Sequence, residues 1–84
     1  MPESKLTFYG TKWCGDCLRA KFFLDRKKVP YTWINIDHDP EAEEFVINTN
    51  GGLRSVPTIV FEDGTILVEP STKALAEKLN LGKP

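Results

Sequence analysis

The stretch "LTFYGTKWCGDCLRA", residues 6–20, contains both cysteines of the chain, and the pattern around them decides the fold. Residues 6–9 are aliphatic, β-branched or aromatic, which is typical of a buried strand, and Gly10 is expected to break that strand. Cys14 and Cys17 then open a segment without proline. The stretch predicts a strand, a short loop and a helix that starts at the cysteine pair.

The predicted helix covers residues 14–28, and a second strand follows it. Val29–Pro30 ends the helix, whose last turn is basic, as the helix dipole favours. Its stripe at helical spacing consists of Ala20, Phe23, Leu24 and Lys27, and its terminal cations are Arg26, Lys27 and Lys28. The second strand is expected at residues 31–36, with Thr32, Ile34 and Ile36 on one side and Tyr31 and a core Trp33 on the other.

A second helix is predicted after this strand. Asp39 is a good N-cap, Pro40 suits the first helical position, and Gly51–Gly52 supplies the stop. The helix is expected to bury a stripe made of Ala42, Phe45, Val46 and Thr49.

The remaining sequence predicts a hairpin and a last helix. In "VPTIVFEDGTILV", residues 56–68, an Asp63–Gly64 turn joins two strands. Pro70 and Ser71 then open a helix with one apolar side, made of Leu75, Ala76 and Leu79.

The order of elements is therefore βαβ, then α, then ββ, then α. A βαβ unit gives two parallel strands, and the hairpin adds two antiparallel ones. We predict an α/β fold in which three helices flank both faces of a four-stranded mixed sheet, an arrangement that resembles the thioredoxin type. The 84 residues suffice for a single domain, residues 1–84.

Composition excludes several classes of function. Hydrophobic residues make up 40% and charged residues 27%, as in ordinary globular proteins. The formal charge of −1 gives no general attraction to nucleic acid or to anionic membranes, and no apolar run is long enough to cross a bilayer. The N-terminal residues show no export signal, so we expect a cytoplasmic protein.

The cysteine pair is better suited to redox chemistry than to a structural bridge. A disulfide from Cys14 to Cys17 would close a very short loop and would stabilise the fold little. At a helix N-terminus, free N–H groups and a nearby Lys12 favour a thiolate at Cys14, whereas Asp16 opposes it, and the sequence leaves the balance open. Cys17 lies on the same helix face and is expected to be more buried. Cys14 is therefore predicted as the nucleophile and Cys17 as the resolving thiol.

Metal binding is the alternative use of these thiols. A structural zinc site needs four ligands, and besides the two cysteines the chain offers His38 with Asp37 or Asp39, both of which already suit structural positions. We predict no bound metal or cofactor. A metal or iron–sulfur cluster shared between two chains stays open as an alternative.

The segment "RSVPTIVF", residues 54–61, is the second candidate site element. A proline directly before a strand is a candidate cis-proline, because cis is inexpensive only at X–Pro bonds. In a thioredoxin-type fold this loop lies beside the cysteine pair. The backbone of Val56 would then be free to pair with an extended substrate.

The motifs "WCGDC" and "SVPTIVFEDGT", with the βαβ–α–ββ–α order, resemble the glutaredoxin family over nearly the whole chain, and residues 44–71 look most like mycoredoxins, the relatives that use mycothiol. This resemblance implies an enzyme that reduces protein disulfides or mixed disulfides of proteins with a low-molecular-weight thiol. It implies Cys14 as nucleophile, Cys17 as resolving cysteine and Pro57 as the cis-proline. It also implies a substrate groove lined by Lys12, Trp13, Arg54, Ser55 and Val56.

One departure from the family bears on the thiol. Glutathione-using members carry a Gly-Gly pair and an Asp after the last strand, where this chain has Val68-Glu69-Pro70-Ser71. The resemblance therefore favours mycothiol over glutathione as co-substrate of a monomeric enzyme. One alternative is a redoxin that is reduced by thioredoxin reductase and donates electrons to ribonucleotide reductase. The other is a dimeric module that binds an iron–sulfur cluster or a metal. The tryptophan-containing tail motif of such redoxins is not found in the sequence.

Overall fold

The computed structural model describes residues 6–80, which form a four-stranded mixed sheet and three α-helices. Strand order is β2-β1-β3-β4, with β1 parallel to β2 and antiparallel to β3, and with β3 antiparallel to β4. This confirms the predicted α/β fold. The elements are β1 (Leu6–Gly10), α1 (Gly15–Arg26), β2 (Thr32–Asn35), the 3-10 helix η1 (Ile36–His38), α2 (Pro40–Thr49), β3 (Thr58–Phe61), β4 (Ile66–Val68) and α3 (Thr72–Leu79).

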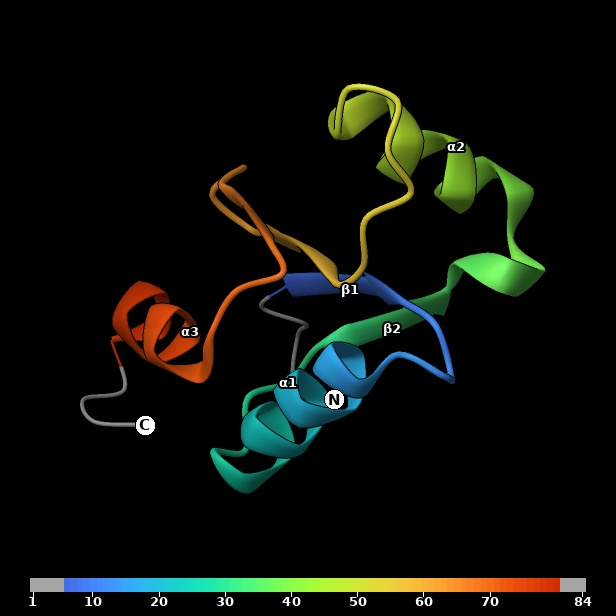
Figure 1. Cartoon of the computed structure of the whole chain (residues 1–84). Coiled ribbons are helices and arrows are strands. Elements are labelled where there is room, and N and C mark those ends of the chain that lie inside the picture. The colour runs from blue at the N-terminus through green and yellow to red at the C-terminus, as the bar shows by residue number, and fades with distance from the viewer. Residues whose placement is uncertain (1–5, 81–84) are drawn as a thin grey trace.

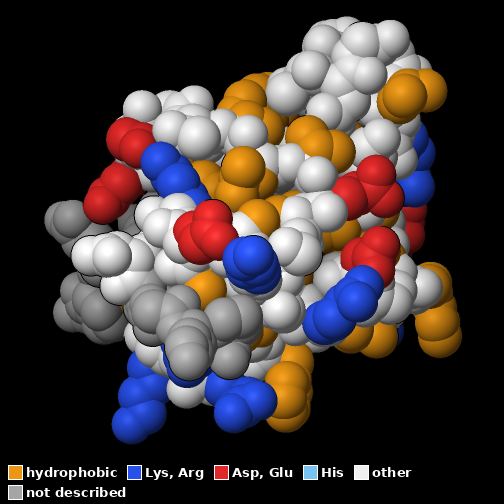
Figure 2. Space-filling view, turned by 60° about the vertical axis from the view of Figure 1, so that its left-hand side comes forward, with side chains coloured by type: hydrophobic (Ala, Val, Ile, Leu, Met, Phe, Trp, Pro, Cys, Tyr) orange, Lys and Arg blue, Asp and Glu red, His pale blue; other side chains and the backbone are white. Residues whose placement is uncertain are grey.

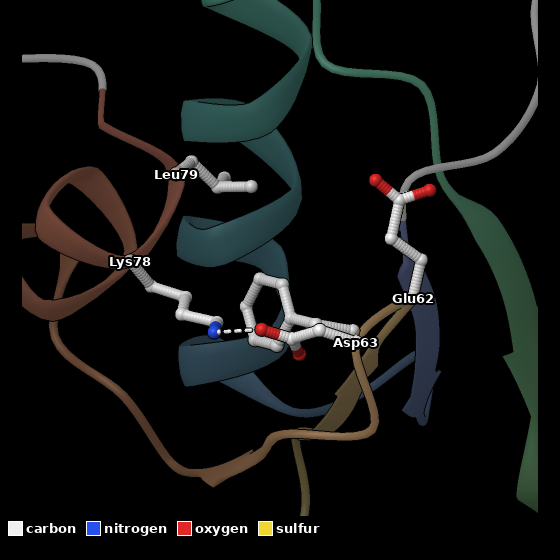
Figure 3. Close-up of a pocket in the computed structure, with 5 residues that line it drawn as sticks. Glu62, Asp63, Lys78 and Leu79 are labelled. Atoms are coloured by element: carbon white, nitrogen blue, oxygen red, sulfur yellow. Dashed lines mark hydrogen bonds and ion pairs between the residues drawn. The ribbon is translucent and has the colours of Figure 1, made fainter.

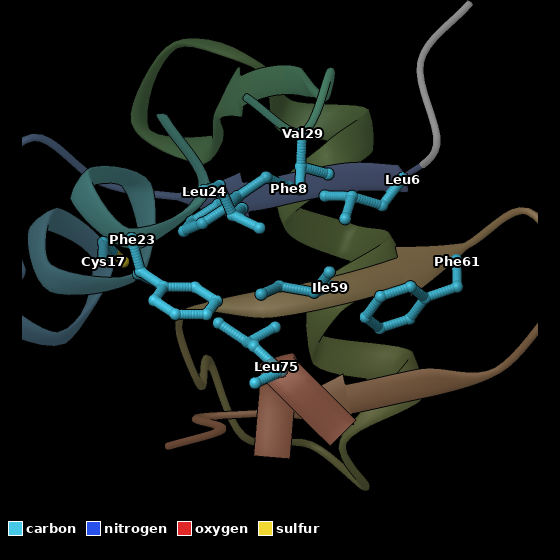
Figure 4. Packing of buried hydrophobic residues seen from close by; sticks show 11 residues of the cluster. Leu6, Phe8, Cys17, Phe23, Leu24, Val29, Ile59, Phe61 and Leu75 are labelled. Atoms are coloured by element: carbon cyan, nitrogen blue, oxygen red, sulfur yellow. The ribbon is translucent and has the colours of Figure 1, made fainter. Parts of the chain in front are cut away.

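Helices cover both faces of the sheet. Helices α1 and α3 lie on one face and α2 on the other (Figure 1). The larger core fills the space between the sheet and helices α1 and α3 (Figure 4). It includes Leu6, Phe8, Cys17, Phe23, Leu24, Ile59, Phe61 and Leu75. A smaller core under α2 consists of Ile36, Ala42 and Val46. Helix α1, which carries Cys17 in this core, is thus fixed to the sheet through its buried side.

Each helix begins at a residue whose side chain accepts a backbone hydrogen bond. Asp39 caps α2, as predicted, by accepting from the Ala42 N–H at 3.1 Å, and Ser71 caps α3 by accepting from the Ala74 N–H at 3.0 Å. Such caps satisfy N–H groups that have no partner within the helix. The cap of α1 is Cys14 itself.

Three predicted boundaries are wrong. Gly10 does not break β1 but is its last residue, because it pairs with Asn35 of the parallel strand. β2 ends at Asn35 rather than at residue 36, because the Asn35 side chain accepts from the Asp37 N–H at 2.9 Å and starts a 3-10 turn. Helix α1 ends at Arg26 rather than at Lys28, which has a positive φ of 57°.

The predicted buried stripe of α2 is also too wide. Ala42 and Val46, one turn apart, are buried, whereas Phe45 and Thr49 are exposed. Phe45 lies at the rim of the sheet with its ring 5.0 Å from that of Tyr9. The helix therefore meets the sheet along a narrow line.

The surface carries charges of both signs. On the face shown in Figure 2, acidic and basic side chains are interspersed among apolar ones. Among residues 6–80, no helix combines the length and the apolar character needed to cross a membrane.

Candidate active site

Cys14 occupies the N-cap of α1, directly after the loop that leaves β1. Its backbone is extended (φ −89°, ψ 116°), and its Sγ accepts a hydrogen bond from the Cys17 N–H at 3.1 Å. The thiol is half-buried. A negative sulfur at this position is favoured both by that N–H and by the positive end of the helix dipole.

The loop before β3 lies against this thiol, although it is far away in the sequence. The Cys14 thiol donates to the Val56 carbonyl at 3.7 Å, a contact between residues 42 positions apart. The Val56–Pro57 peptide bond is cis, as predicted. The structure thus brings Cys14, Val56 and Pro57 to one place.

Cys17 lies behind Cys14, inside the larger core. Its side chain is 0% exposed. Burial, followed by the hydrogen bond with Cys14 and the charge on Cys14, raises the pKa of Cys17 to about 12. At neutral pH Cys17 is therefore a protonated thiol, as the sequence interpretation of the pair expects.

Gly10 is a site residue that sequence reasoning missed. A Cβ at this position would come within 2.9 Å of Cys17 Sγ and within 2.9 Å of the Trp33 ring. Trp33 is half-buried beside Phe8, with ring centroids 5.2 Å apart, and Lys21 covers it at 4.2 Å. Only a residue without a side chain leaves room for the resolving sulfur here. The available signal was the glycine at the end of an otherwise bulky strand.

The charged and aromatic neighbours of Cys14 in sequence point toward solvent. Trp13, which the family resemblance places in a substrate groove, is 88% exposed next to Cys14 in the sequence. Lys12 is exposed as well. Asp16 forms an ion pair with Arg19, which offsets its repulsion of a thiolate at Cys14.

Arg54 does not point freely into solvent. It forms ion pairs with Asp37 of η1 and, at 2.6 Å, with Glu43 of α2. The hydrogen bond to Glu43, then that to Asp37, raises the pKa of Arg54. The adjacent Ser55 carbonyl accepts from the buried Thr58 hydroxyl at 2.8 Å. The predicted ligand-binding cation is thus already held by two carboxylates that fix its loop to α2.

A surface hollow lies away from the cysteine pair (Figure 3). It is lined by Phe61, Glu62, Asp63, Lys78 and Leu79, and Phe61 pairs with Leu6 at the end of β1 opposite the cysteines. Lys78 donates to Asp63 at 2.6 Å and, by that hydrogen bond, lowers the pKa of the Asp63 carboxyl. This ion pair ties α3 to the β3–β4 turn and has no part in the thiol site.

Metal ligands are not gathered in the described part of the chain. Residues 6–80 contain no group of three His, Cys, Asp or Glu side chains that could hold a metal ion. His38, the one histidine of the sequence, is exposed in η1. A zinc site within one chain would need ligands that this region does not assemble.

The difference between the two thiols predicts selective alkylation. Iodoacetamide reacts with thiolates, so brief treatment of the reduced native protein at pH 7.5 is expected to modify Cys14 and to leave Cys17 intact. Mass spectrometry should find one added group in the native protein and two after unfolding. Equal labelling of both thiols in the native protein would contradict the assigned burial of Cys17.

The fold and the site define a thiol–disulfide oxidoreductase of thioredoxin-like architecture. The family model for glutaredoxin matches residues 6–66. A Mycobacterium tuberculosis protein whose name classes it as a glutaredoxin is 44% identical over 79 residues, which are 94% of each chain. Mycoredoxin 1 of Corynebacterium glutamicum is 37% identical over 76 residues, 90% of this chain and 94% of that one.

A solved structure supports the thioredoxin-like architecture. The crystal structure of a variant of a thioredoxin-like protein superposes with a TM-score of 0.80 and 26% identity, and it covers 93% of this chain and 97% of that one. The chain belongs to the glutaredoxin family.

Proposed function

We propose that the protein removes a low-molecular-weight thiol from mixed disulfides on proteins, and that this thiol is mycothiol. The observation that carries the activity is the pairing of Cys14, the half-buried N-cap of α1, with the fully buried Cys17. The similarity to mycoredoxin 1 supports mycothiol. Arg54 supports it too, because two carboxylates already engage the cation that could bind a carboxylate of glutathione.

In the first step the Cys14 thiolate attacks the sulfur of the small thiol. The S–S bond of the mixed disulfide breaks, and the protein thiolate leaves with both bonding electrons. The product is a disulfide between Cys14 and the small thiol. The Val56 carbonyl, 3.7 Å from Cys14 Sγ, lies beside the new bond and can accept a backbone N–H of the ligand.

In the second step Cys17 resolves this intermediate. The charge on Cys14 is one cause of the raised pKa of Cys17, and formation of the mixed disulfide removes that charge. Cys17 then gives its proton to the departing small thiol as it attacks Cys14 Sγ, and a Cys14–Cys17 disulfide forms. Two further molecules of the small thiol, which become a disulfide, return the pair to the reduced state. Thioredoxin reductase is the alternative electron donor.

The Cys17→Ser variant tests the proposal, because it stops the reaction after the first step. We expect it to take one thiol from a model protein that carries a mycothiol mixed disulfide, and to take glutathione at least about tenfold more slowly. Intact mass spectrometry identifies the adduct on Cys14.

The matched control is the Cys14→Ser, Cys17→Ser double variant, which should take up nothing. Transfer of glutathione as fast as mycothiol would overturn the thiol assignment. If neither thiol is transferred while thioredoxin reductase and NADPH reduce the wild-type disulfide, the redoxin function replaces this one.

A further inference from the structure

The net charge of the chain is near zero, but positive and negative charges are concentrated in different parts of the sequence. Residues 11–28, which contain the loop before Cys14 and all of α1, carry six Lys and Arg and two Asp, a net charge of +4. All other residues together carry five Lys and Arg and ten Asp and Glu, a net charge of −5. The positive part of the chain is the part that bears the nucleophile.

The outer side of α1 is also apolar. Leu18 and Phe22, one turn apart on α1, are 54% and 64% exposed, whereas Cys17, Ala20, Phe23 and Leu24 of the same helix are buried. Arg26, one turn further, lies over the Phe22 ring at 5.9 Å. Together with the exposed Trp13, these residues make up what we call the outer α1 surface, defined as Trp13, Leu18, Phe22 and Arg26.

This surface starts at the nucleophile. Trp13 precedes Cys14 and Gly15 follows it, and a Cβ at Gly15 would meet no atom within 4 Å, so the first turn of α1 is uncrowded next to the nucleophile. The two carboxylates of the region have partners of their own, since Asp16 pairs with Arg19 and Asp25 accepts from the Tyr31 hydroxyl at 3.0 Å. A molecule that lies on Cys14 can therefore extend along α1 over apolar side chains and cations.

We propose that the outer α1 surface docks the protein substrate and selects proteins whose modified cysteine is flanked by apolar and acidic residues. This inference rests on the proposed function, because it needs a protein disulfide at Cys14. Charge complementarity identifies the partner as acidic, and continuity with the nucleophile identifies it as the protein part of the substrate. A docked chain is held next to Cys14 by contacts that a small disulfide cannot make.

Two peptides of equal length, each with its cysteine in a mixed disulfide with mycothiol, test this specificity. One has Asp and Leu around the modified cysteine, and the other has Lys and Ser. At low salt we expect wild-type kcat/KM to be about tenfold higher for the acidic, apolar peptide, and to lose most of that advantage at about 0.5 M KCl, where charges are screened. The Leu18→Gln, Phe22→Gln double variant should lose the apolar part of the preference, and Arg26→Glu should lower it further.

Reduction of a small neutral disulfide separates this proposal from the proposed function. We expect both variants to reduce it within about twofold of wild type, because the docking contacts lie outside the thiol site. The matched control is Ile66→Gln, an exposed apolar residue of β4, which should not alter the peptide preference.

Equal rates for both peptides with intact reduction of the small disulfide would overturn the docking surface and leave the proposed function in place. If wild type prefers the acidic, apolar peptide, and added anionic vesicles or excess inactive chain abolish that preference, the result would support the docking surface, because the added component competes with the peptide for it. Binding of vesicles without any peptide preference would overturn it. No activity on any disulfide would refute the proposed function itself.

Discussion

Replacement of Cys14 by serine is expected to abolish disulfide reduction. A serine hydroxyl stays protonated at neutral pH and cannot displace a thiolate, so kcat/KM should fall by at least about three orders of magnitude, as on removal of other covalent nucleophiles. Cys17 cannot replace it, because Cys17 is fully buried and burial raises its pKa to about 12. The measurement is reduction of a protein mixed disulfide, followed by release of the free protein thiol.

Two controls give this result its meaning. Cys17→Ser should still take up one small thiol, because the first step needs only Cys14. Thermal unfolding of Cys14→Ser should resemble wild type, since a serine side chain is also a good N-cap for α1. Retention of wild-type activity by Cys14→Ser would assign the chemistry to another group and end the proposed mechanism.

The second large effect is expected at Gly10. Gly10→Ala would place a methyl group 2.9 Å from Cys17 Sγ and from the Trp33 ring, both of which are packed in place. Overpacking of this kind costs about 1–3 kcal/mol in free energy of unfolding. For a domain of this size, that corresponds to a melting temperature lower by about 4–24 °C. The displaced Cys17 sulfur should also slow resolution of the mixed disulfide.

Gly15→Ala is the matched control for the same chemical change. Gly15 is the first residue of α1, and a Cβ there would meet no atom within 4 Å. Alanine is up to about 1 kcal/mol better than glycine within a helix, so this variant should be as stable as wild type or slightly more so. Thermal melts followed by circular dichroism compare the two. Equal melting temperatures for both variants would show that the space around Gly10 accommodates a methyl group.

The order of the elements was predictable because each boundary has a local chemical signal. Asp39 and Ser71 marked helix starts, the Asp63–Gly64 turn marked the hairpin, and Pro57 marked the cis bond. The exposure of Phe45 was not predictable, because helical periodicity does not reveal how wide a stripe the sheet covers.

The cysteine pair of the candidate site was predictable from the sequence, whereas the roles of two other residues were not. Cys14 and Cys17 stand three residues apart, so the local pattern was enough to assign their places on the helix. The roles of Gly10 and Arg54 depend on contacts across the fold: Gly10 meets Trp33 of the neighbouring strand, and Arg54 meets Asp37 and Glu43 from other elements. Such contacts leave no periodic signal in the sequence.

The place of Cys17 within the larger core joins reactivity to folding. The side chains that exclude water from its sulfur, such as Phe23 and Leu24, are the same ones that hold α1 on the sheet. A substitution that loosens this packing lets water reach the sulfur, which favours the ionised form and shifts the balance between dithiol and disulfide. Evolution can therefore adjust the reducing power of this protein through aliphatic and aromatic residues that never touch a substrate.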